Sequence, residues 1–208
     1  MKLGFLYAGQ GSQHAGMGAD LYEAFSAFRA VYDHAEVDFD LKKVTFEDPD
    51  GIINQTRYTQ PCMVAFAAGM TALLAERGIV PDYAAGLSLG EYSALYCAGV
   101  FDKETALQTV ALRGRAMEEA ARGLECGMTA VLGLDREKLQ QACQEASQLG
   151  VVQICNYNCP GQLVISGEKA AVDKAGELAK ELGAKRCMPL KVSGPFHTGL
   201  MKPAGDAL

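Results

Sequence analysis

Residues 86–90 read Gly-Leu-Ser-Leu-Gly, and a serine flanked in this way is typical of a nucleophile at the apex of a sharp strand-to-helix turn. Glycine is needed on both sides because so tight a turn leaves no room for β-carbons two residues before and after the serine. The Ser88 hydroxyl would then lie at a helix N-terminus, where the backbone N–H of Leu89 points to the oxyanion formed when Ser88 attacks a carbonyl carbon. The alternative is a turn serine that only caps a helix.

A serine nucleophile needs a general base, and the chain has only three histidines, His14, His34 and His197. His197 is the best placed by context, because it follows a Gly-Pro turn at an expected domain junction. A purely structural histidine is the alternative.

A glycine-rich loop at 8–18 follows the first apolar run of the chain. It lacks the third glycine of a dinucleotide-binding loop, which is replaced by His14, and it has no phosphate-binding lysine. Such a loop can bring backbone N–H groups and the side-chain amide of Gln10 or Gln13 close to a ligand. A solvated flexible turn is the alternative.

Arg113 falls in the middle of an apolar helical stripe, three residues after Val110 and four before Met117. A guanidinium that points toward the core needs a partner, since an unpaired buried charge is costly. The partner could be a buried carboxylate of the protein, or the stem could lie flat with its head in water. It could also be a substrate carboxylate, gripped by two N–H groups of the arginine.

These side chains are expected on a set of strands and helices read from hydrophobic periodicity. The nucleophile would follow a strand that ends at Ala85. The expected strands and helices of the first part are a strand at 2–7, a helix at 20–32, a short helical excursion with loops at 33–58, a core helix at 59–76 with Pro61 in its first turn, and a helix at 102–122.

From about residue 124 the pattern changes to β-α-β-β-α-β, the order of a ferredoxin-like module. The strands are expected at 128–132, 151–156, 162–166 and 185–189, with helices at 135–149 and 168–182, and residues 198–208 are helix-like. We therefore predict an α/β protein whose large domain, 1–123 and 191–208, is interrupted by a small subdomain at 124–190.

Composition restricts the class of protein. The 208 residues are 49% hydrophobic and 21% charged, as in a soluble globular protein, and the formal charge of −6 argues against nucleic-acid and anionic membrane partners. The N-terminus has no signal-like apolar segment and no stretch reaches membrane-spanning length, which favours the cytoplasm. Seven cysteines without a Cys-x-x-Cys motif indicate packed, reduced thiols, and we expect no metal and no cofactor.

Four separated segments together resemble the malonyl-CoA:acyl-carrier-protein transacylases of fatty acid synthesis. They are Ala-Gly-Gln-Gly-Ser-Gln at 8–13, Gly-Leu-Ser-Leu-Gly-Glu-Tyr at 86–92, Leu-Arg-Gly-Arg-Ala-Met at 112–117 and Val-Ser-Gly-Pro-Phe-His at 192–197. They occur in the order of that family and span the chain. The resemblance implies an α/β-hydrolase-like large domain with a ferredoxin-like insertion, which agrees with the division inferred from periodicity.

By the same resemblance, Ser88 would take the malonyl group from coenzyme A as an ester, and His197 would move its proton. Gln10 and the Leu89 amide would form the oxyanion hole, and Arg113 would hold the free malonyl carboxylate. The phosphopantetheine thiol of acyl carrier protein would attack the ester in a second half-reaction, which predicts ping-pong kinetics.

Phe196, beside the base, would crowd an α-methyl group and so favour malonyl over methylmalonyl by roughly 1–3 kcal/mol. Leu87 stands where many relatives have histidine, and we expect little loss from it.

Family members continue past residue 208, so the C-terminal part of the large domain is expected to be missing from this sequence. The full-length enzyme is expected to be a monomer.

Two rival functions remain open. A serine thioesterase or esterase could use the same serine and histidine, although an enzyme for uncharged acyl chains has no use for Arg113. The other rival is an inactive shortened chain that only binds acyl carrier protein or coenzyme A thioesters.

Overall fold

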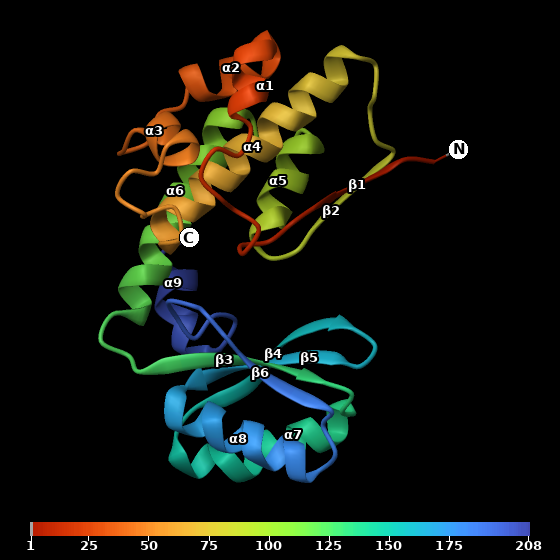
Figure 1. The fold of residues 1–208 in the computed structure, drawn as a ribbon, viewed down its shortest axis with the longest axis vertical. Helices are drawn as coiled ribbons and strands as arrows, with labels where there is room; N and C mark the ends of the chain where they lie inside the picture. Colours follow the sequence, from red (N-terminus) through yellow and green to blue (C-terminus); the bar gives the residue numbers. More distant parts are fainter. Residues whose placement is uncertain (1) are drawn as a thin grey trace. The chain divides into compact units, whose positions relative to one another are not determined.

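The computed structural model describes residues 2–208 and confirms the predicted α/β fold class. Its contacts divide the chain into two compact units, residues 1–115 and 116–208, which are treated separately below. Figure 1 shows the elements of both units along the chain.

The first unit is built on two parallel strands, β1 (Gly4–Tyr7) and β2 (Tyr83–Gly86). The register pairs Gly4 with Tyr83 and Tyr7 with Gly86, so both strands end at the same edge of the sheet. One face of the pair is open to solvent, with Leu6 85% and Tyr83 66% exposed. Side chains alternate between the faces of a strand, so Phe5 and Tyr7 lie on the other, partly buried face.

The helix predicted at 20–32 is in fact two helices, α1 (Ala19–Ala24) and α2 (Ser26–Asp33). Phe25 separates them with an extended backbone, φ −130° and ψ 120°. The Arg77 guanidinium lies 4.6 Å from the centre of the Phe25 ring, a contact between residues far apart in sequence that periodicity alone could not reveal. The helical excursion expected at 33–58 is α3 (Leu41–Phe46), which begins at an Asp40 cap.

The core helix α4 (Thr56–Glu76) begins three residues earlier than predicted. Pro61 therefore lies in the second turn and not in the first, and its missing N–H leaves the carbonyl four residues earlier without that helical partner. Within residues 2–208, α4 is the one helix long and apolar enough to cross a membrane, but half of its most apolar window is buried in the protein. That burial is typical of the core helix of a soluble protein.

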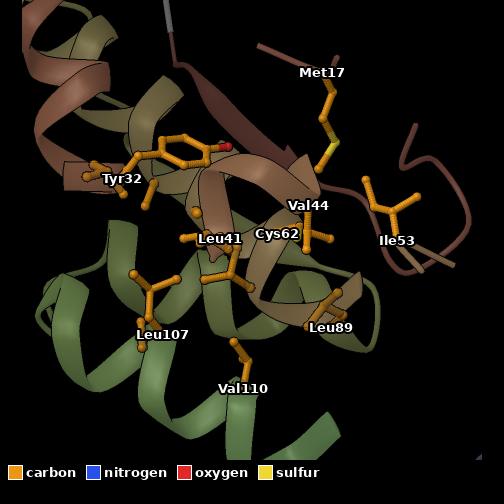
Figure 2. Packing of buried hydrophobic residues seen from close by; sticks show 14 of the residues in the cluster. Met17, Tyr32, Leu41, Val44, Ile53, Cys62, Leu89, Leu107 and Val110 are labelled. Carbon is orange, nitrogen blue, oxygen red and sulfur yellow. The ribbon is translucent and has the colours of Figure 1, made fainter. Parts of the chain in front are cut away.

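Two more helices complete this unit, α5 (Leu89–Cys97) and the first part of α6 (Lys103–Ala121). The chain passes directly from β2 into α5, as the predicted strand, turn and helix require. Figure 2 shows the core, where side chains of α2, α3, α4, α5 and α6 meet. The buried residues labelled there include Tyr32, Leu41, Val44, Cys62, Leu89, Leu107 and Val110.

The second unit contains the predicted β-α-β-β-α-β order. Its four strands form one antiparallel sheet in the order β4-β5-β3-β6, and the two helices pack on it around a shared apolar cluster. The elements are β3 (Cys126–Leu132), α7 (Arg136–Ala146), β4 (Val152–Cys159), β5 (Gln162–Glu168), α8 (Lys169–Glu181) and β6 (Arg186–Leu190), with a 3-10 turn at Ser147–Leu149. Placing the first strand between the third and the fourth is the ferredoxin-like arrangement.

The chain after β6 forms a 3-10 turn (Gly199–Met201) and a short helix, α9 (Lys202–Asp206). Ala204 of α9 packs with Met117, Met128 and Phe196 in a small core of the second unit. Residues 191–208 thus group with 116–190 by their contacts. The assignment of residues 191–208 to the large domain, with domain boundaries at 123 and 191, stays a prediction.

Candidate active site

The turn that carries Ser88 needs both of its glycines. A β-carbon on Gly86 would overlap the backbone of Gly90, and one on Gly90 would overlap the carbonyl of Tyr7. Tyr7 ends β1, so α5 begins in direct contact with the end of the sheet. The steric requirement inferred from the sequence is therefore met at both positions.

Ser88 itself has a backbone conformation that side chains rarely adopt, φ 52° and ψ −103°. Such a conformation costs on the order of 1–3 kcal/mol and persists only where the surrounding structure imposes it. Ser88 holds the N-cap position of α5, but its side chain makes no capping hydrogen bond. Instead its Oγ accepts a hydrogen bond of 3.2 Å from Nη2 of Arg113, so a helix cap does not explain the serine.

The Gln10 loop lies beside this turn because β1 and β2 are parallel and end together. Gly9 approaches so closely that a β-carbon there would lie 2.8 Å from the Leu87 carbonyl oxygen. The Gln10 side chain donates to Oγ1 of Thr56 on α4 at 3.2 Å. Leu89 is the first residue of α5, where a backbone N–H has no acceptor within the helix. These two amides are thus carried by segments next to Ser88.

Leu87 has an exposed side chain, while its backbone N–H donates to the carbonyl of Tyr7 at 3.1 Å. The backbone of this residue therefore holds the turn to the end of β1. Nothing in these contacts requires a particular side chain at position 87.

Arg113 of α6 lies against Ser88 with its guanidinium partly buried. Nη1 donates to Oε1 of Gln60 at 2.9 Å, and the guanidinium carbon lies 5.4 Å from the centre of the Tyr92 ring. Burial lowers the pKa of Arg113 from its ordinary value, and the nearby Tyr92 and Glu91 oppose that shift. Among the described residues no carboxylate lies within 4.0 Å of this guanidinium, so the structural salt bridge left open by the sequence is not observed.

His197 lies in the second unit, in the turn between β6 and the Gly199–Met201 helix, and its backbone has a φ of 59°. Thr198 holds this turn, because its Oγ1 donates to the Pro195 carbonyl at 2.7 Å and accepts from the N–H of Leu200. Gly199 is held in turn by Gln153 of β4, whose side-chain oxygen accepts its N–H at 2.9 Å. A fixed turn thus presents an exposed His197 in this unit. Its pairing with Ser88 stays a prediction.

Phe196 has a packing role that the sequence did not reveal. Its side chain is only 8% exposed and lies in the small core with Met117, Met128 and Ala204. Gly194 is needed for this packing, since a β-carbon there would lie 2.7 Å from the Phe196 ring. The predicted crowding of an α-methyl group by Phe196 stays a prediction.

The sequence reading missed three contributors to the site, Gln60, Thr56 and Tyr92. Gln60 and Thr56 are fully buried polar residues near the start of the core helix α4. Buried polar groups need hydrogen-bond partners, so a polar residue inside an apolar run could have served as a signal. Tyr92 follows the turn motif directly and gave no comparable signal.

Within residues 2–208 no group of three or more histidine, cysteine or acidic side chains could hold a metal ion. Two cysteines that are close in sequence are both free thiols: Cys155 donates to the Val164 carbonyl at 3.3 Å, and Cys159 is exposed.

Comparison with known proteins shows what this arrangement belongs to. Residues 4–208 match the acyl transferase domain family. The malonyl CoA-acyl carrier protein transacylase of Bacillus subtilis is 45% identical over 210 residues, which are all of this chain and 66% of that protein. The Escherichia coli K12 enzyme of the same name is 41% identical, and the chain covers 68% of it.

Solved structures agree with the sequence matches. The MCAT of Streptococcus pneumoniae is 50% identical with a TM-score of 0.92, over 99% of this chain and 68% of that one. A malonyl-transacylase solved in complex with a type II PKS acyl-carrier protein is 42% identical with a TM-score of 0.93, again over 99% and 68%. The chain spans about two thirds of the length of the relatives it matches. On these matches, and on a serine turn faced by an arginine without a carboxylate partner, the chain belongs to the acyltransferase family of malonyl-CoA:acyl-carrier-protein transacylases.

Proposed function

We propose that this chain transfers a malonyl group from coenzyme A to the phosphopantetheine thiol of acyl carrier protein through an ester on Ser88, and so feeds fatty acid synthesis. The observation that carries the proposal is the 3.2 Å hydrogen bond between Arg113 Nη2 and Ser88 Oγ. In a malonyl ester the free carboxylate lies three covalent bonds from Oγ. The Arg113 guanidinium lies this close to Oγ and forms no salt bridge with a carboxylate of the described residues. It can therefore bind the malonyl carboxylate directly.

In the first half-reaction Ser88 Oγ bonds to the thioester carbon while His197 takes the hydroxyl proton. The carbonyl oxygen becomes an oxyanion, stabilised by the Leu89 N–H and the Gln10 amide. Collapse of this intermediate breaks the carbon–sulfur bond, and His197 returns the proton to the coenzyme A thiolate. In the second half-reaction the carrier-protein thiol attacks the ester, with the same groups acting in reverse order.

Each of these steps uses side chains and backbone of the chain itself, so no metal and no cofactor take part. The negative net charge of −6 and the core position of α4 support a cytoplasmic protein without a nucleic-acid or membrane partner. The full-length enzyme would act as a monomer. Acyl carrier protein is the expected partner, because a relative 42% identical to this chain was solved in complex with such a protein.

Intact-protein mass spectrometry after brief exposure to malonyl-CoA tests the proposal. The wild-type chain should gain one malonyl group and lose it when a holo-acyl carrier protein is added. Ser88→Ala should gain none, while Ser26→Ala, which changes an exposed serine of α2, should behave as wild type. Arg113→Ala should lower the rate of malonyl uptake by about 100-fold, since losing one charge-assisted hydrogen bond costs about 1.5–3 kcal/mol.

The rival functions give different results in the same experiment. A thioesterase would release the malonyl group to water before any thiol is added. A chain that only binds carrier protein or coenzyme A thioesters would show no adduct although it is folded. Either result would contradict the proposal.

A further inference from the structure

Helix α4 carries a glutamine where its surroundings are apolar. Gln60 is 0% exposed and lies between Thr59 and Pro61, among residues of the first core. Burying an amide side chain costs free energy unless its polar atoms are hydrogen-bonded. Oε1 of Gln60 accepts from Nη1 of Arg113 at 2.9 Å, so the buried amide is directed at the arginine.

This hydrogen bond fixes Nη1, one of the two terminal nitrogens of the planar Arg113 guanidinium. Its other terminal nitrogen, Nη2, donates to Ser88 Oγ, and the Tyr92 ring covers one face. Holding an arginine side chain in one conformation costs rotational entropy. By holding the guanidinium toward Ser88 before substrate binds, Gln60 reduces the entropy that is lost on binding.

The close approach of two helices makes this contact possible. A β-carbon on Gly114, the residue after Arg113, would lie 2.8 Å from Cα of Arg57 and 3.0 Å from the Thr56 carbonyl oxygen. Only glycine allows α6 to pass so near the first turn of α4. Arg113 therefore enters beside Gln60, one turn further along α4.

The important property of Gln60 is that its side chain carries no charge, so it leaves the positive charge of Arg113 available to substrate. Glutamate has the same shape and would bind the guanidinium more strongly, but it would cancel the positive charge. We infer that Gln60 is a positioning residue that orients Arg113 toward Ser88 while leaving its charge unpaired, and that it thereby makes the site specific for acyl groups with a free carboxylate. This inference rests on the proposed function, since the acyl group is held on Ser88.

The test compares malonyl-CoA with acetyl-CoA, which lacks the carboxylate. Rates of Ser88 acylation by both thioesters are measured for wild type, Gln60→Glu and Gln60→Ala. The control is Gln55→Glu, the same chemical change at the exposed N-cap residue that precedes α4. Crystal structures of Gln60→Glu and Gln60→Ala record the Arg113 conformation independently of activity.

Gln60→Glu should lower the malonyl-to-acetyl ratio of kcat/KM by about 100-fold, mostly through KM, with acetyl transfer within about threefold of wild type. Gln60→Ala should lower the ratio by about tenfold, and Arg113 should leave Ser88 in its crystal structure. Gln55→Glu should keep the ratio within about twofold.

Three results would overturn the inference. The malonyl-to-acetyl ratio could be unchanged in Gln60→Glu. Malonyl and acetyl transfer could fall equally, as expected of a residue that only supports the fold. The crystal structure of Gln60→Ala could keep the Arg113–Ser88 hydrogen bond. Failure of wild type to take up either acyl group would instead count against the proposed function, and the two crystal structures would still decide whether Gln60 orients Arg113.

Discussion

Ser88 and His197, the two residues assigned to proton transfer, share an unusual backbone. Among residues 2–208 only Asp48, Ser88 and His197 have a positive φ without being glycine. Asp48 is explained locally, because its carboxylate accepts the N–H groups of Ile52 and Ile53. Backbone strain of this kind gathers at functional sites, where it fixes the direction of a reactive side chain.

At the scale of residues, the sequence predicted the candidate site side chains that belong to a recognisable sequence pattern, either a motif or a helical periodicity. Ser88 followed from its glycines, and Arg113 followed from its place in an apolar stripe. Gln60 did not, because its partner Arg113 is 53 positions away and helical periodicity relates only near neighbours. Its importance comes from a contact between two helices, which a single sequence does not display.

The cysteines give a prediction at this scale that is independent of catalysis. Burial raises the pKa of the Cys62 thiol to about 12, and Cys62 is 0% exposed. Burial likewise raises the pKa of Cys143 to about 11 and that of Cys155 to about 12. Iodoacetamide at pH 8 should therefore modify the exposed Cys159 first and leave these three unmodified, because the thiolate is the reactive form.

Peptide mapping after timed alkylation measures that order, and Cys159→Ser is the matched control that should remove the fast phase. Labelling of the buried thiols should grow as the pH rises toward 11. The folded state keeps them protonated above their unfolded pKa, so alkaline pH also favours unfolding. Fast labelling of Cys62 in folded protein at pH 8 would contradict the prediction.

At the scale of elements, the type and order of the helices and strands could be predicted from the sequence. The break within the first predicted helix and the starting residue of α4 could not. The β-α-β-β-α-β module follows from the hydrophobic period alone. The extended Phe25 between α1 and α2 does not, since Leu21, Phe25 and Phe28 keep a helical spacing across the break. Pro61 misled in the same way, because proline in the second turn of α4 is unusual on local grounds.

The junction between β1 and α5 gives a prediction for this scale. Gly90→Ala should lower the free energy of unfolding by about 3 kcal/mol, because its β-carbon would overlap the Tyr7 carbonyl and a packed backbone has nowhere to move. The Ser88 turn should be displaced at the same time, so acylation should fall with stability. Urea denaturation followed by circular dichroism measures the first effect, and mass spectrometry the second.

Gly205→Ala is the control for that measurement. A β-carbon on Gly205 meets no atom within 4 Å, and the residue lies in helix α9, so alanine should be neutral or stabilise by up to about 1 kcal/mol. If Gly90→Ala and Gly205→Ala had the same stability, the close contact at Gly90 would be of no consequence for the fold.

At the scale of the whole chain, residues 2–208 leave one face of the β1–β2 pair open to solvent, and we expect this face to affect the association of the chain in solution. Leu6 and Tyr83 lie on that face, and within residues 2–208 neither edge of the two-stranded sheet has a further partner strand. Exposed apolar surface beside free strand edges promotes association. Tyr83→Lys should therefore raise the solubility of the chain severalfold.

Static light scattering as a function of protein concentration measures this effect. Tyr157→Lys is the matched control, because Tyr157 is also an exposed tyrosine on a strand but belongs to the four-stranded sheet of the second unit. Equal gains from both substitutions would show that added charge alone, and not the open face, accounts for the change.

The parallel register of β1 and β2 also has a consequence for how the chain folds. Leu3 and Asp82 are joined by a hydrogen bond at the start of the pair and are 79 positions apart in the sequence. Helices α1 to α4 separate the two strands along the chain. Closing so long a loop costs entropy before the strands gain their hydrogen bonds, and such distant contacts slow folding. The Ser88 turn is built on the ends of these strands, so we expect the proposed site to form only after the helices that separate them in the sequence have folded.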